Sequence, residues 1–101
     1  MDTNTESMDE YLLVTDIDEL EEGNEYYFSF YNSNYYSNGL YKVDMIFISF
    51  WGRKVAYIIN DEIEFNLYLD IKSNSKYLFT TDMYKCKINI YKLTTTDYVL
   101  K

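Results

Sequence analysis

The sequence predicts an all-β domain, a small antiparallel barrel or sandwich of six or seven short strands. Segments of alternating apolar and polar residues recur at intervals of roughly 8–12 residues, with short polar connections between them. Aromatic residues make up 20% of the chain, and aromatic and β-branched side chains fit pleated surfaces. No segment carries a long 3.6-residue period, so the pattern argues against an α/β chain.

The first 25 residues divide into a tail, a strand and an acidic segment. Residues 1–10 are polar and acidic, and we expect them to form a disordered tail ahead of a single β domain at residues 11–101. The apolar run at residues 11–15 predicts the first strand. Residues 16–23 follow with Ile17 and Leu20 three positions apart, and either one capped helical turn or a structured acidic loop is compatible with that spacing.

The middle of the chain alternates with period two. Residues 25–31 predict a strand, residues 32–39 a polar connection, and residues 40–51 a long strand. The second half of that strand is apolar at almost every position, so we expect it to be buried on both faces or bent around a corner. Gly52 then supplies a positive φ in a tight turn.

The last third predicts three more strands and a short edge. Residues 55–59 lead through a two-residue turn at Asn60 and Asp61 into residues 62–71, which alternate most regularly, with Ile63, Phe65, Leu67, Leu69 and Ile71 facing the core. A short strand at residues 77–80 and a longer one at 83–93 follow. Residues 94–97 are expected to break the pattern, and residues 98–100 to close the sheet.

The order of these segments resembles small SH3-like barrels over residues 11–71. The matching features are a strand, an acidic loop, Gly23, an aromatic strand that begins two residues later, a long strand and a glycine turn. The peptide-binding motifs of true SH3 domains are absent. The resemblance therefore implies a barrel and transfers no ligand.

Charge is segregated along the chain. Residues 1–25 hold ten of the seventeen acidic residues and no Lys or Arg, whereas the remaining residues hold seven acids and nine bases. The net charge of −8 thus divides into an arm of −10 and a body of +2. A compact acidic segment favours basic partners and salt-sensitive association.

Composition excludes many chemistries. Without histidine the chain has no imidazole catalyst or ligand, and its single cysteine cannot build a zinc or iron–sulfur site. The three glycines stand apart, so no phosphate-binding loop is encoded. Glu62, Glu64 and Asp70 share one face of a predicted strand, where a solvated surface explains them. We therefore expect no catalytic residue, no metal site and no cofactor, hence no enzyme.

The remaining hypotheses are binding functions. We expect a protein-interaction module that holds a basic protein, such as a host nucleic-acid-binding protein, through the acidic loop and exposed tyrosines, because tyrosine gives large contact area at low entropic cost. The residues expected at that surface are Asp16, Asp18, Glu19, Glu21, Glu22, Tyr27, Tyr31, Tyr35 and Tyr36. A nucleic-acid mimic that inhibits such a protein and a virion or assembly protein are the alternatives.

Three further expectations concern context. A body charge of only +2 argues against direct nucleic-acid binding, and exposed strands leave homo-oligomers open. The first residues lack the basic and apolar regions of a signal peptide, and no apolar run is long enough to span a bilayer, so we expect a cytoplasmic protein. Abundant Asn, Ile, Lys and Tyr with no proline and one alanine indicate an AT-rich genome, as in many phages and large DNA viruses.

Overall fold

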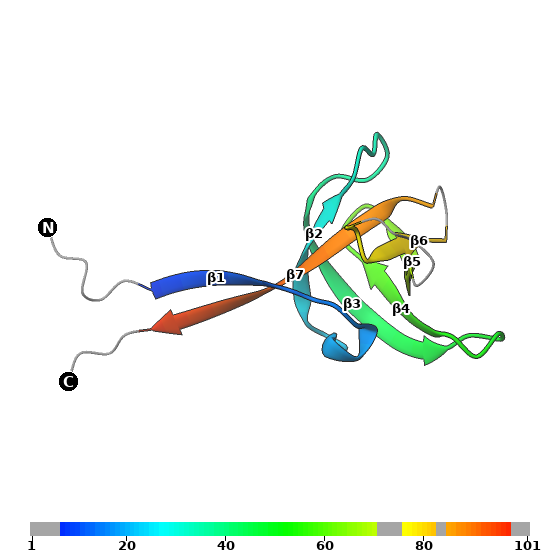
Figure 1. The fold of residues 1–101 in the computed structure, drawn as a ribbon, viewed down its shortest axis with the longest axis horizontal. Coiled ribbons are helices and arrows are strands. Elements are labelled where there is room, and N and C mark those ends of the chain that lie inside the picture. The colour runs from blue at the N-terminus through cyan, green and yellow to red at the C-terminus, as the bar shows by residue number, and fades with distance from the viewer. Residues whose placement is uncertain (1–6, 71–75, 83–84, 98–101) are drawn as a thin grey trace, which may run out of the picture.

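The chain folds into one antiparallel sheet that closes into a barrel (Figure 1). A computed structural model describes residues 7–70, 76–82 and 85–97. One short 3₁₀ helix, η1 (Ile17–Glu19), precedes the second strand. The strands are β1 (Ser7–Leu13), β2 (Glu25–Phe30), β3 (Gly39–Ile48), β4 (Lys54–Ile59), β5 (Glu64–Leu69), β6 (Phe79–Thr81) and β7 (Lys87–Asp97).

The barrel is an up-and-down arrangement of six strands. Strands β2 to β7 pair with their neighbours in chain order, and β7 closes the barrel by pairing with both β6 and β2. The predicted all-β fold is thus confirmed, and of the two predicted architectures the chain adopts the barrel. The narrower SH3-like resemblance stays a prediction.

Strand β7 is longer than the barrel requires. Its first residues pair with β6 and β2, whereas the remainder pairs with β1, from Tyr91 opposite Leu13 to Asp97 opposite Ser7. Strands β1 and β7 therefore leave the barrel as a two-stranded ribbon, which carries the start of β1 and the end of β7 away from the body (Figure 1). The ribbon elongates the molecule: its radius of gyration is 15.6 Å, against about 13 Å for a compact domain of this size.

Aromatic residues dominate the centre of the barrel. Phe28 is fully buried, and its ring lies 5.1 Å from that of Tyr41 and 6.1 Å from that of Phe65. Cys86 belongs to the same core cluster as Ile88 and Ile90. Such tilted and edge-to-face rings bury large apolar areas at favourable electrostatic geometry.

A β-bulge in β3 overturns the prediction that the end of this strand is buried. Val43 lies opposite Ile58 and Met45 lies opposite Tyr57, so Asp44 is an extra residue between them. The extra residue reverses the alternation. Ile46, opposite the buried Ala56, packs against the core in place of Met45, while Met45 and Phe47 become exposed.

Several predicted boundaries also differ. Residues 7–10, assigned to the tail, pair with β7 as the start of β1, because β7 offers them a partner that sequence composition does not reveal. Residues 94–97, expected to break the pattern, continue β7 for the same reason. The turn after β4 spans residues 60–63, where the Asn60 side chain accepts hydrogen bonds from two backbone N–H groups. The predicted edge strand at 98–100 and residues 1–6 lie outside the described residues.

A matched pair of substitutions tests the core. Phe28→Ala removes a ring that is fully buried, so it should lower the free energy of unfolding by about 3–5 kcal/mol. Phe50→Ala removes an exposed ring and should change it by less than about 0.5 kcal/mol. Urea denaturation followed by tyrosine fluorescence measures both. Equal losses for the two variants would contradict the described core.

Candidate functional site

The acidic segment is an ordered loop held against the barrel. Ile17 and Leu20 are buried in the core, and between them the chain makes the single turn of η1. Asp16 caps this turn, because its carboxylate accepts a hydrogen bond from the backbone N–H of Asp18 at 3.0 Å. The sequence allowed either a capped helical turn or a structured loop, and the chain combines the two as one capped 3₁₀ turn within an ordered loop.

Each predicted carboxylate of the loop has a local partner. Glu19 accepts from the Thr15 hydroxyl at 2.7 Å, Glu21 accepts from the Asn24 side chain at 3.0 Å, and Asp18 forms an ion pair with Lys54. These contacts lie at the surface, so the carboxylates stay exposed to solvent. The loop therefore presents negative charge in fixed positions.

Glu22 joins the acidic loop to the β3–β4 hairpin. The Gly23 N–H donates to the Val43 carbonyl at 2.7 Å, which continues the ladder past the end of β2. Beyond the bulge, a Glu22 carboxylate oxygen accepts from the Ile46 N–H at 2.7 Å. The Glu22 side chain therefore gives the backbone N–H of Ile46 a hydrogen-bond partner at the point where the backbone ladder between β2 and β3 stops.

Tyr36 is not a surface residue, which corrects its assignment to the binding surface. Its side chain is only 4% exposed and stacks on Phe30 at 4.9 Å with an angle of 10° between the rings. Burial raises the pKa of Tyr36 above its ordinary value, although a hydrogen bond with Thr81 opposes the shift. The polar sequence around it predicted a loop, and the loop folds back so that this one residue joins the core.

Tyr31 and Tyr35 are exposed but lie far from the acidic loop. Each is 55% exposed, and both belong to the connection between β2 and β3. Strand β2 runs from the acidic loop to this connection, and its five residue steps separate the two regions by about 17 Å. The structure therefore does not bring these tyrosines together with the predicted acids.

Tyr27 lies in an apolar row on the outer face of the sheet. The register places Leu13, Tyr91, Tyr27 and Leu40 side by side across four neighbouring strands, and we call these four residues the tyrosine row. The Tyr11 ring lies 5.9 Å from that of Tyr27 and 6.5 Å from that of Tyr91. Tyr11, Leu13 and Leu40 are exposed, so this face offers apolar contact area next to the acidic loop.

Among the described residues, the most exposed large apolar side chains belong to a segment whose sequence predicted a long strand. Phe50 is 91% exposed and Trp51 is 83% exposed, at the turn between β3 and β4, and Ile48 beside them is exposed as well. We call Ile48, Phe50 and Trp51 the hairpin tip. The sequence did contain a signal, because Trp51 precedes Gly52 in a predicted turn and turns run over the protein surface. The apolar run before them obscured it by suggesting a buried strand.

Basic residues beside the hairpin tip are engaged within the protein. The Arg53 guanidinium donates to the Leu69 carbonyl and lies 5.3 Å from the centre of the Tyr68 ring. Lys54 pairs with Asp18. Through Asp18, the acidic loop therefore places one carboxylate at the base of this hairpin.

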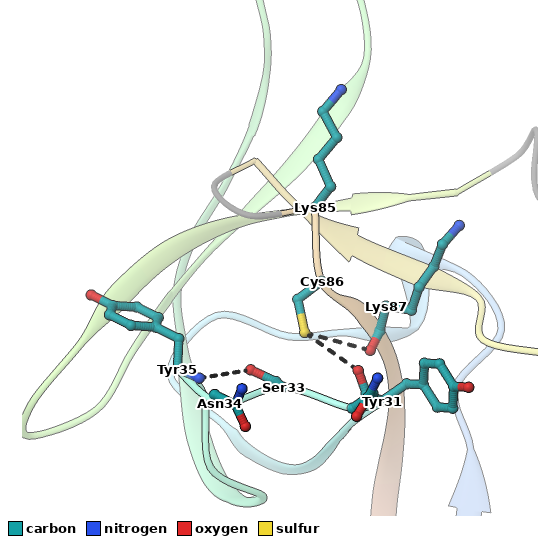
Figure 2. Close-up of a pocket in the computed structure, with 8 residues that line it drawn as sticks. Tyr31, Ser33, Asn34, Tyr35, Lys85, Cys86 and Lys87 are labelled. Carbon is teal, nitrogen blue, oxygen red and sulfur yellow. Dashed lines mark hydrogen bonds between the residues drawn. The ribbon is translucent and has the colours of Figure 1, made fainter.

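A pocket of about 390 Å³ lies at the other end of the barrel, between Tyr31, Tyr35 and residues 85–87. Figure 2 shows the Cys86 sulfur turned toward the Tyr31 and Lys87 carbonyls, each 4.0 Å away, while the Lys85 and Lys87 side chains extend away from it. The Ser33 hydroxyl accepts from the Tyr35 N–H at 3.1 Å, and Lys87 pairs with Asp70. Ser33, Cys86 and Lys87 are thus engaged within the fold.

Comparisons with known proteins give no relative: no family model, no curated protein and no solved structure matches the chain. Within the described ranges, no helix is long and apolar enough to cross a membrane. In the same part of the chain, no three or more Cys, Asp or Glu side chains are grouped so as to hold a metal ion.

Tyrosine nitration tests the placement of the tyrosines. Tetranitromethane attacks the phenolate of accessible tyrosines, so Tyr31 and Tyr35 should react early. Tyr36 and Tyr41 should react late, because burial hides them and raises their pKa. Tyr57 should also be slow, since its hydrogen bond with Glu64 raises its pKa to about 12. Peptide mapping by mass spectrometry gives the order, and early nitration of Tyr36 would contradict its burial.

Proposed function

We propose that the protein is a non-enzymatic interaction module that binds a basic protein through the hairpin tip and the acidic loop. The observation that carries the proposal is the exposure of Phe50 and Trp51, 91% and 83%, beside an ordered acidic loop. The loop carries over the acidic residues Asp16, Asp18, Glu19, Glu21 and Glu22 from the sequence hypothesis. The tip replaces Tyr31, Tyr35 and Tyr36 as the aromatic part of the surface.

The hairpin tip supplies an apolar anchor. Exposed apolar side chains are common singly, but two adjoining exposed aromatic rings on one turn, with an exposed isoleucine two residues before them, favour an interaction site. The Phe50 and Trp51 rings already contact each other at 5.3 Å in an edge-to-face arrangement. Binding would therefore order few side-chain torsions, which reduces its entropic cost. Tryptophan is also among the residues that contribute most to protein interfaces.

The acidic loop supplies charge complementarity. Its carboxylates are held by local hydrogen bonds, so they need little reorganisation on binding. Two contacts, Glu22 to Ile46 and Asp18 to Lys54, fix the loop beside the base of the same hairpin. An apolar pocket rimmed by Lys or Arg matches this combination. Such charges raise the association rate and help to exclude wrong partners.

Charge also favours a protein over other classes of partner. Nucleic acids and anionic membrane surfaces repel the carboxylates of the loop, and Lys54, beside the hairpin tip, is paired with Asp18. A basic protein gains from the same field. The nucleic-acid mimic remains a special case of this proposal, in which the partner's basic surface is one that also binds DNA or RNA.

Removal of the tryptophan tests the anchor. Trp51→Ala should weaken binding of the captured partner by about 2 kcal/mol or more, which is roughly a 30-fold increase in Kd. Its unfolding free energy should stay within about 0.5 kcal/mol of that of the wild-type protein, because Trp51 is exposed. The matched control is Tyr35→Ala, an exposed aromatic residue at the far end of the barrel. Affinity capture from a lysate of the source organism, followed by titration calorimetry, measures both. If Tyr35→Ala is the damaging change, the anchor has been placed at the wrong end.

Charge neutralisation tests the loop. Asp18→Asn with Glu21→Gln keeps the acceptor oxygens and removes two charges, so the association rate should fall several-fold and depend less on salt. The control is Asp61→Asn with Glu62→Gln, which removes two exposed carboxylates elsewhere. Stopped-flow association at low and high salt separates the pairs. Identical rates for the two double variants would show that the loop gives no electrostatic help. Competition by DNA or RNA for the partner would identify the mimic.

A further inference from the structure

We propose that the outer edge of β1 binds an extended basic segment of the partner by strand addition. This inference rests on the proposed function, because it names how a second part of the same basic partner is held. The edge lies on the ribbon, apart from the hairpin tip (Figure 1). The two contacts can therefore fail separately.

The register of β1 fixes which backbone groups face outward. The Val14 N–H donates to the Ile90 carbonyl at 2.8 Å, and this pair continues the register of Leu13 with Tyr91. Alternate residues of an antiparallel strand direct their N–H and C=O groups to the same neighbour. Glu10 and Leu12 therefore face β7 as Val14 does.

The alternate groups of β1 face away from β7. By the same alternation, the N–H and C=O groups of Asp9, Tyr11 and Leu13 lie on the outer edge. In the ranges 7–70, 76–82 and 85–97, no strand pairs with that edge. A row of unpaired backbone donors and acceptors is a template for a further strand.

The outer face of the sheet continues beside this edge. Tyr11 and Leu13 are two residues apart in β1, so both lie on the exposed face, next to Tyr91 and Tyr27 of the tyrosine row. Alternate side chains of an added strand would lie on the same face. Aliphatic stems and cationic heads of Lys or Arg suit tyrosine rings, which attract cations over their faces.

Charge decides between a basic segment and a second copy of this chain. Each copy carries a net charge of −8, so two copies repel each other. A segment in which Lys or Arg alternates with β-branched residues is attracted by the same net charge.

Hydrogen exchange gives a direct test on the complete chain. The probe is a capped peptide with the sequence Lys-Val-Lys-Val-Lys-Val-Lys, and its control has Glu in place of Lys. At saturating lysine peptide, exchange of the Tyr11 and Leu13 amides should slow by about tenfold or more, whereas that of the Leu12 amide should change little, because it already bonds to β7. The acidic peptide should have no effect, and added salt should weaken the lysine peptide.

Two variants distinguish the contribution of the Tyr11 backbone N–H to peptide binding from that of the Tyr11 ring. Tyr11→Pro and Tyr11→Ala both remove the ring, but only proline removes the outward N–H, and proline is tolerated on an edge strand. Tyr11→Pro should bind the lysine peptide at least tenfold more weakly than Tyr11→Ala. Unchanged exchange of the Phe28 amide in both variants shows that the barrel is intact. Equal affinities, or slowing at Leu12 equal to that at Tyr11, would overturn strand addition.

The outcomes also separate this inference from the proposed function. Loss of partner capture in Trp51→Ala but not in Tyr11→Pro leaves the proposed function standing and refutes strand addition. Retention of capture in Trp51→Ala refutes the hairpin anchor, whatever the peptide does. Slowing of the Tyr11 amide with rising protein concentration, in the absence of peptide, would show that a second copy occupies the edge.

Discussion

The fold depends on the three-way pairing of β7. Its N-terminal residues hold β6 on one side and β2 on the other, which closes the barrel and removes the edges of six strands. Its C-terminal residues pair with β1 and continue past the barrel wall. One strand thus both closes the barrel and leaves an open strand edge outside it. The part of β7 inside the barrel has no open edge, and the part outside pairs with β1, whose outer edge is open.

The acidic loop depends on the same geometry. Val14 bonds to Ile90 at the point where β1 meets the barrel, and the chain then turns through η1 with Ile17 and Leu20 in the core before β2 begins. The loop must therefore cover the end of the barrel between β7 and the β3–β4 hairpin. Glu22 and Asp18 secure it to that hairpin. Along the loop, buried apolar residues are interspersed with exposed acidic residues. The carboxylates of these acidic residues carry surface charge and also accept hydrogen bonds within the protein.

The sequence predicted features that depend on local alternation. The inward residues Phe65 and Leu67 and the all-β class follow from period-two patterns and turn residues, which left barrel and sandwich open. The spacing of Ile17 and Leu20 likewise allowed an ordered acidic loop. Features that depend on distant pairing were missed. No local pattern indicates that β7 would extend to Asp97, or that residues 7–10 would find a partner there. Tyr36 was misplaced because a polar loop hides the one residue that reaches Phe30.

The bulge at Asp44 explains why the candidate site itself could not be predicted. Strict alternation puts Tyr41, Val43, Met45 and Phe47 on one face, which predicts burial for all four. One extra residue moves Ile46 to the core face and sends Met45 and Phe47 outward. Beyond that point the hairpin passes the end of the acidic loop, so the apolar run from Ile48 to Trp51 has no sheet or loop of the described chain to cover it. A segment whose sequence predicted burial on both faces is therefore exposed at Met45, Ile48, Phe50 and Trp51. Ile48, Phe50 and Trp51 are costly to leave in water, and occupation of the tip by a partner would remove that cost.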